Sequence, residues 1–144
     1  MTKLDCRIDY GCKKKLKKDI KICHSIYLGD VMAKYLLLMY GKEMKMPKKV
    51  TKEMAEAGMK PWRDYLKPLI KKGSFGAAAP VAWKGKMMTS GRTQDYKPRN
   101  IDLVGYMVIS AGNMPEALRI AKKSPHAKMA GTTTTVREIM EVPL

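Results

Sequence analysis

The chain has 144 residues, of which 45% are hydrophobic and 29% are charged, and this composition suits one globular domain with its own core. It excludes collagen-like and proline- or glycine-rich low-complexity proteins. Lysine and arginine total 29 against 13 acidic residues, so the formal net charge is +16 and an anionic partner has to be considered. Apolar stretches such as residues 35–40 are far shorter than the roughly 20 residues of a membrane helix, so we expect no membrane span.

The first 31 residues differ in composition from the rest of the chain. All three cysteines, Cys6, Cys12 and Cys23, lie there, and a lysine-rich run follows Cys12. The segment has no apolar block of signal-peptide length. We therefore expect a cytoplasmic protein with reduced thiols.

Three interpretations of this N-terminal segment stay open. A zinc knuckle would use Cys6, Cys12, Cys23 and His24, although zinc ligands usually come in closer pairs. A basic arm over residues 13–21 would grip phosphates. In the third interpretation Met32 is the natural first residue, because residues 28–31 can be encoded by a purine-rich ribosome-binding stretch. We thus expect a basic extension over residues 1–32, either without fixed structure or outside the natural protein, and a folded domain over residues 33–144.

The first half of the domain predicts a strand and a helix. The apolar run of residues 35–40 predicts a strand covered on both faces, since one buried face would give an alternating pattern. Thr51 precedes acidic residues and predicts a helix N-cap. The helix pattern ends at Gly73. Pro61 and Pro68 lie within it and predict a short first piece, followed by a main helix that begins near Pro61.

The middle of the domain predicts a second strand and a hairpin arm. Residues 74–83 read as a strand of small residues in which Pro80 indicates an edge or a bulge. Residues 86–90 predict a short hairpin arm. We expect a polar loop over residues 91–102.

The last part repeats the pattern of the first. Residues 103–109 predict the strongest strand, again apolar on both faces. Asn113 predicts the N-cap of a helix that continues to Lys123, with Pro115 in its first turn. Residues 132–140 are β-branched and alternate, which predicts a final strand.

This order of elements predicts an α+β domain with the ferredoxin-like βαββαβ arrangement. In that arrangement two helices cover one face of a four-stranded antiparallel sheet. The strands that are apolar on both sides require a cover for the second face as well. An identical subunit across a two-fold axis is the simplest cover, so we expect a homodimer.

Several pieces of the domain, in their order and spacing, carry a resemblance to a known family. They are residues 34–41, the helix with Trp62, Tyr65 and Leu66 that ends at Gly73, residues 105–109, residues 115–117, Ser124-Pro125-His126, Gly131-Thr132 and residues 136–139. Through them residues 33–140 resemble the YCII-related family. The resemblance implies the dimeric α+β barrel superfamily, in which two such domains pair.

The resemblance also bears on catalysis. Enzymatic members of the family have a His on the first helix and an Asp before the proline that follows the second helix. The matching positions here hold Trp62 and Ser124, so acid-base chemistry by that dyad is not carried over. A subgroup has an Asp-Gly-Pro-Phe motif before the third strand. Residues 90–96 do not match it, and Asp95 and Tyr96 are a distorted remnant at best.

The candidate site residues each have a functional and a structural interpretation. His126 is the only histidine of the domain and the first choice for proton transfer, with Asp95 as its rival if burial raises the carboxylate pKa. His126 can equally be a turn residue after a proline. The candidate ligand-binding residues are Trp62, Tyr65, Trp83, Ser124 and Arg137. The aromatic residues among them also suit a core, and Arg137 suits an ion pair with an acid such as Glu138.

Four functions remain in competition. We favour a small YCII-like homodimer with a pocket for a small organic ligand, and the missing dyad favours binding over turnover. The alternatives are a cofactor-free enzyme that acts on a ring compound through His126 or Asp95, a polyanion or nucleic-acid binder with a basic surface, and an interaction module without ligand. Nucleic acid is the less favoured partner, because RNA-binding sheets need the face that the dimer would cover. No motif of the domain over residues 33–144 indicates a metal or a cofactor.

Overall fold

The computed structural model describes residues 32–143. The predictions for residues 1–31, which are the zinc knuckle, the basic arm and the displaced start, lie outside the described residues. In chain order the elements are β1 (Ala33–Gly41), α2 (Lys52–Lys71), β2 (Phe75–Pro80), β3 (Gly85–Thr89), β4 (Arg92–Tyr96), β5 (Asp102–Ala111), α3 (Met114–Lys122), the 3-10 helix η1 (His126–Lys128) and β6 (Thr133–Glu138).

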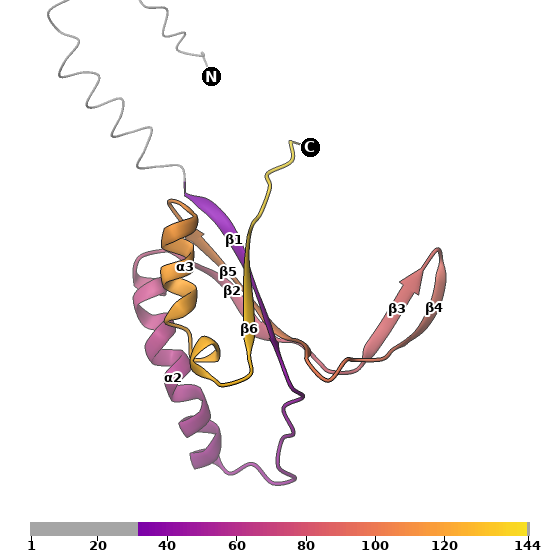
Figure 1. The fold of residues 1–144 in the computed structure, drawn as a ribbon. Coiled ribbons are helices and arrows are strands. Elements are labelled where there is room, and N and C mark those ends of the chain that lie inside the picture. Colours follow the sequence, from indigo (N-terminus) through magenta and orange to yellow (C-terminus); the bar gives the residue numbers. More distant parts are fainter. Residues whose placement is uncertain (1–31, 144) are drawn as a thin grey trace, which may run out of the picture. The chain divides into compact units, whose positions relative to one another are not determined.

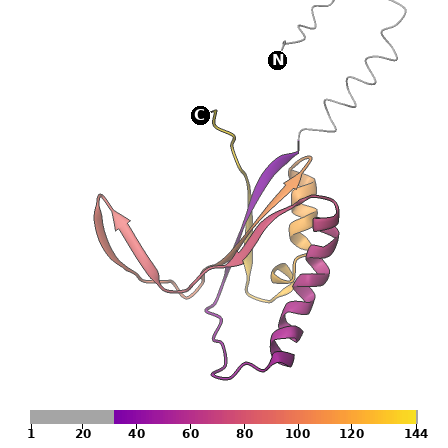
Figure 2. The same cartoon turned by 180° about the vertical axis from the view of Figure 1, so that it is seen from behind.

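The chain folds as an α+β domain with a four-stranded antiparallel sheet, as predicted. The strands lie in the order β2-β5-β1-β6, and all neighbours are antiparallel. Both helices lie on one side of the sheet, as Figures 1 and 2 show from opposite directions. This arrangement is compatible with the predicted ferredoxin-like fold. Strands β3 and β4 form a separate hairpin.

The two helix starts are capped as the sequence predicts. The Thr51 hydroxyl accepts a hydrogen bond from the Met54 amide at 3.2 Å, and the Asn113 side-chain oxygen accepts one from the Glu116 amide at 2.9 Å. Each cap satisfies an amide that has no partner within the first helical turn. These two local interactions therefore fix where α2 and α3 begin.

The predicted break of the first helix at Pro61 is wrong. Helix α2 runs without interruption from Lys52 to Lys71, with Pro61 and Pro68 inside it. Each proline removes one backbone hydrogen bond and crowds the preceding turn. Both prolines are exposed, so the carbonyls that they leave free can bind water instead. The bonds on either side of each proline keep the helix continuous.

The predicted polar loop over residues 91–102 is also wrong in its first half. Residues Arg92–Tyr96 pair with Gly85–Thr89 as the second strand of the hairpin. The two turn residues, Ser90 and Gly91, have φ values of 49° and 77°, and this left-handed pair matches the twist of a tight hairpin. Strand β4 is polar and exposed along its whole length, so it shows no apolar alternation that would reveal a strand.

Strand β2 is bulged and ends earlier than predicted, at Pro80 instead of Trp83. The register against β5 shifts between Phe75 and Ala77. A Cβ atom at Gly76 would lie 3.0 Å from the Val108 carbonyl oxygen, so only glycine fits this close approach. The predicted bulge therefore lies at Gly76, while the proline marks the strand end.

The core lies between the helices and one face of the central strands. It is formed by Tyr35, Leu37 and Met39 of β1, Met107, Ile109 and Ala111 of β5, and Ala117 and Ala121 of α3. The two alanines let α3 approach the sheet closely. Trp62, Tyr65 and Leu66 of α2 pack against the edge of this cluster.

The opposite face of the central strands is apolar as well. Leu36 pairs with Val108, Leu38 with Tyr106 and Tyr40 with Leu103. Paired residues point to the same side of a sheet, and all of these except Leu103 alternate with the buried core residues. Leu103 comes opposite Tyr40 through the register shift between Met39 and Tyr40. All six are partly exposed, and both helices lie over the other side. We call these six residues the open face.

Replacement of Leu37 tests this core. Leu37 is fully buried, so Leu37→Ala is expected to lower the free energy of unfolding by about 2–5 kcal/mol through lost burial and the cavity left behind. Leu118→Ala is the matched control, because Leu118 is 40% exposed and should change stability by less than about 1 kcal/mol. Urea titrations followed by circular dichroism measure both. Equal effects in the two variants would show that the core is misplaced.

Candidate ligand site at the base of the hairpin

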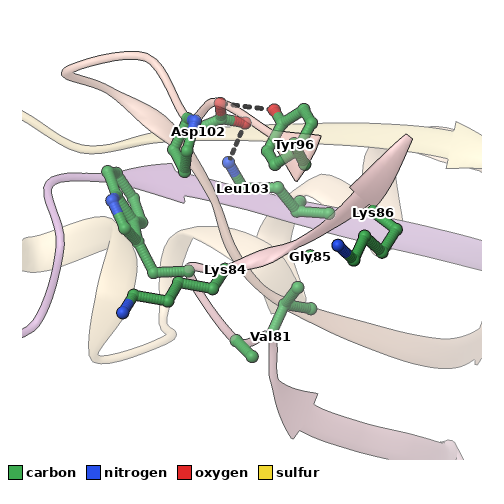
Figure 3. Close-up of a pocket in the computed structure, with 10 residues that line it drawn as sticks. Val81, Lys84, Gly85, Lys86, Tyr96, Asp102 and Leu103 are labelled. Carbon is green, nitrogen blue, oxygen red and sulfur yellow. Dashed lines mark hydrogen bonds between the residues drawn. The ribbon is translucent and has the colours of Figure 1, made fainter. Parts of the chain in front are cut away.

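A surface hollow of about 300 Å³ lies where the segment after β2, the base of the hairpin and the start of β5 meet (Figure 3). Its walls are mainly apolar and aromatic, with two lysines and one carboxylate among them. The lining residues are Val81, Ala82, Trp83, Lys84, Gly85, Lys86, Tyr96, Pro98, Asp102 and Leu103. The hollow is within the size range of small-molecule sites.

A hydrogen-bond network around Asp102 fixes one wall of the hollow. The Tyr96 hydroxyl and the Leu103 backbone amide, the latter at 2.7 Å, donate to the Asp102 carboxylate (Figure 3). The backbone amide of Arg99 donates to the same carboxylate at 2.9 Å. The Tyr96 hydrogen bond and then the two amides lower the pKa of Asp102, while the same bond raises the pKa of Tyr96. Asp102 is therefore a stable anion that holds the hairpin base against β5, and not a base poised near neutral pH.

The two lysines of the hollow differ in their partners. Lys86 forms an ion pair with Asp95 directly across the hairpin, and both side chains are largely exposed. Lys84 takes part in neither of the two ion pairs found among the described residues. Its side chain is part of the lining of the hollow, which also holds the Asp102 carboxylate on another wall. An anionic group of a ligand would find its counter-charge there.

His126 does not line the hollow, and its contacts are with the backbone of neighbouring strands. It is 7% exposed, and its Nε2 lies 3.1 Å from the Tyr40 carbonyl and 3.4 Å from that of Thr133. Since carbonyl oxygens only accept hydrogen bonds, Nε2 must be the protonated nitrogen that donates. The Thr132 hydroxyl donates to the His126 carbonyl at 2.8 Å. The ring therefore ties the end of β1 to the start of β6.

Three other candidate residues serve the packing of the helices. Ser124 is fully buried, and its hydroxyl accepts a hydrogen bond from the Ala127 amide of η1 at 3.2 Å. Trp62 and Tyr65 meet edge to face, with ring centroids 6.0 Å apart. The Tyr65 hydroxyl donates to the Ile120 carbonyl at 2.8 Å and so joins α2 to α3. Burial raises the pKa of Tyr65 to about 12, which keeps this donor protonated.

The structure does not bring the predicted site residues together. Trp83 lines the hollow, whereas Arg137 lies exposed on β6 opposite Leu36. Asp95 lies on the exposed outer strand of the hairpin. Neither Lys84 nor Asp102 was predicted to be a site residue. A prediction that Gly85 pairs with Tyr96 would have indicated both, because this pair closes the base of the hairpin and brings the residues before β3 close to those after β4.

Residues 32–143 contain neither a cluster of metal-binding side chains nor a helix that could span a membrane. Within this part of the chain no three His, Cys, Asp or Glu side chains gather as a metal site would require. No helix in the same range has the length and apolar composition needed to cross a membrane. Compared with known proteins, the chain matches no family model and no curated protein.

The pKa of Asp102 tests the network at the hairpin base. Because the Tyr96 hydrogen bond is the largest cause of the lowered pKa, Tyr96→Phe should raise the Asp102 pKa toward its ordinary value. At a pH above the ordinary carboxylate pKa, the lowered pKa of Asp102 stabilises the folded state. This contribution is lost as the pH falls through the lowered pKa. NMR titration of the carboxyl carbon measures the shift. An unchanged pKa would show that the hydroxyl does not bind this carboxylate.

Proposed function

We propose that the protein is a YCII-like homodimer that binds a small organic molecule in the hollow at the base of the hairpin. The hollow itself carries the proposal, because an apolar and aromatic wall with a few fixed polar groups is the usual construction of a small-molecule site. Trp83 and Tyr96 suit a ring, and Lys84 suits an anionic group. The ligand class that fits best is an aromatic carboxylate. A cytoplasmic location stays a prediction of the sequence.

The open face supports the homodimer. Six neighbouring apolar residues on the central strands form one patch, whereas the charged residues on that side, Lys34 and Arg137, lie at a strand end and on the edge strand. Burial of a leucine or valine side chain is worth about 1.5–3 kcal/mol. A second copy related by a two-fold axis would present the same patch and bury both at once.

The contacts of the two candidate acid-base groups favour binding over catalysis. The His126 ring donates its Nε2 proton to a backbone carbonyl, and Asp95 is an exposed carboxylate in an ion pair with Lys86. Neither residue lines the hollow. A cofactor-free enzyme that acts on a ring compound through either residue is the weaker alternative, because it would need a second site.

The open face also carries the one observation that favours nucleic acid. Tyr40 and Tyr106 are partly exposed on the two central strands, and bases of a single strand stack on aromatic residues placed in this way. The net charge of +16 adds attraction for phosphates. This second candidate and the homodimer need the same surface, so they exclude each other at this face.

The oligomeric state distinguishes these two candidates. We expect a dimer by light scattering at micromolar concentration, both for the full chain and for residues 33–144. Val108→Asp should give a folded monomer, because it places a charge in the centre of the open face. Leu118→Asp, on the exposed side of α3, should remain a dimer. Two results together would favour the nucleic-acid candidate instead. The wild type would be a monomer, and it would bind a fluorescent oligouridine in a complex that dissociates when salt is added.

Tryptophan fluorescence tests the ligand site. The chain has two tryptophans, so in a Trp62→Phe background Trp83 is the sole reporter beside the hollow. Salicylate should quench it with a saturable curve, and salicyl alcohol should bind more weakly. Lys84→Met should weaken salicylate binding about fivefold, the scale of one partly exposed charge pair of about 1 kcal/mol. Lys97→Met is the control. The absence of saturable quenching would refute an aromatic carboxylate ligand.

A further inference from the structure

The β3–β4 hairpin is an arm without cover in the described chain. All ten of its strand residues are exposed, including Met87 at 38% and Met88 at 72%. Figures 1 and 2 show that the hairpin projects from the sheet, with its tip away from every other element. A solvent-exposed hairpin of two strands is at best marginally stable in water. The arm therefore lacks the packing that would hold it in place.

The arm is nevertheless well defined in its conformation. Its strands pair in a continuous register from Gly85 with Tyr96 to Thr89 with Arg92. The left-handed turn at Ser90 and Gly91 closes the tip, and the hydrogen bond from Tyr96 to Asp102 anchors the base. Such a preformed arm loses little conformational entropy when it meets a partner. This combination of order and exposure indicates a contact arm.

The direction of the arm identifies its partner. The hairpin leaves the sheet on the side opposite the helices, which is the side of the open face. A second copy that covers the open face would therefore lie beside the hairpin. Two-fold symmetry would place each arm along the other copy, and the two exposed methionines could pack there because this side chain adapts to irregular surfaces.

We propose that the β3–β4 hairpin clasps the second copy of this chain and that the hollow at its base lies at the boundary between the two copies. This inference rests on the proposed homodimer and adds to it a contact that the sheet face does not supply. It also links the two parts of the proposed function. Dimer formation holds the hairpin, and the hairpin base forms the walls of the ligand site.

The test compares two pairs of exposed methionines in the full chain. Met87→Glu with Met88→Glu should raise the dimer dissociation constant by about tenfold or more, because dimer formation would then bury carboxylates that have no partner. Met54→Glu with Met59→Glu is the matched control. These residues are 51% and 53% exposed on α2, on the helix side of the sheet, and should leave the constant unchanged. Sedimentation equilibrium measures both.

A second measurement on the unmodified protein covers the case in which the substitutions disturb the hairpin itself. With ¹³C-methyl methionine, the signals of Met87 and Met88 should be shielded from a soluble paramagnetic agent in the dimer and exposed on dilution. If the wild type is a dimer but the methyl groups of Met87 and Met88 are not shielded, the clasp is overturned and the homodimer stands. The same conclusion follows if the two pairs of substitutions give equal dissociation constants. A monomeric wild type would overturn the proposed homodimer and the clasp together.

Discussion

The apolar second face of the sheet, on the side away from the helices, is the feature on which the proposed homodimer depends. An antiparallel sheet commonly packs one face on its core and presents polar residues to water on the other. In this chain Leu36, Leu38 and Val108 occupy the positions where polar residues would be expected. At about 25 cal/mol per Å² of apolar area, such a patch represents a large part of the roughly 5–15 kcal/mol by which domains are stable. In the proposed homodimer, assembly would therefore add to the stability of the fold through this face.

Most of the polar side chains that look functional in the sequence instead stabilise the side of the sheet that packs against the helices. His126 joins β1 to β6, Tyr65 joins α2 to α3, and the Ser124 hydroxyl binds the Ala127 amide of η1. Each satisfies a backbone group in a part of the fold where water has little access, and leaving such a group unpaired costs about 1–3 kcal/mol. The residues that line the hollow lie at the hairpin base and are not part of the buried core cluster.

Local patterns predicted most of the fold and little of the candidate site. Apolar runs and the caps Thr51 and Asn113 are short-range signals, and they located the strands and the helix starts. Strand β4 escaped prediction because its pairing depends on the left-handed turn at Ser90, a conformation that non-glycine residues rarely adopt. The hollow could not be predicted from the sequence, because Tyr96 reaches Asp102 only through the pairing of β3 with β4.

Intermolecular NMR contacts across the open face test the central claim most directly. In a mixed sample of ¹³C-methyl-labelled and unlabelled chains, isotope-filtered spectra detect only contacts between different copies. If the homodimer pairs through the open face, we expect contacts from the methyl groups of Leu36, Leu38 and Val108 to aromatic protons of the unlabelled copy. Tyr40 and Tyr106 would supply these aromatic protons. The absence of these contacts at concentrations where the protein is dimeric would contradict this pairing, because the dimer would then use another surface.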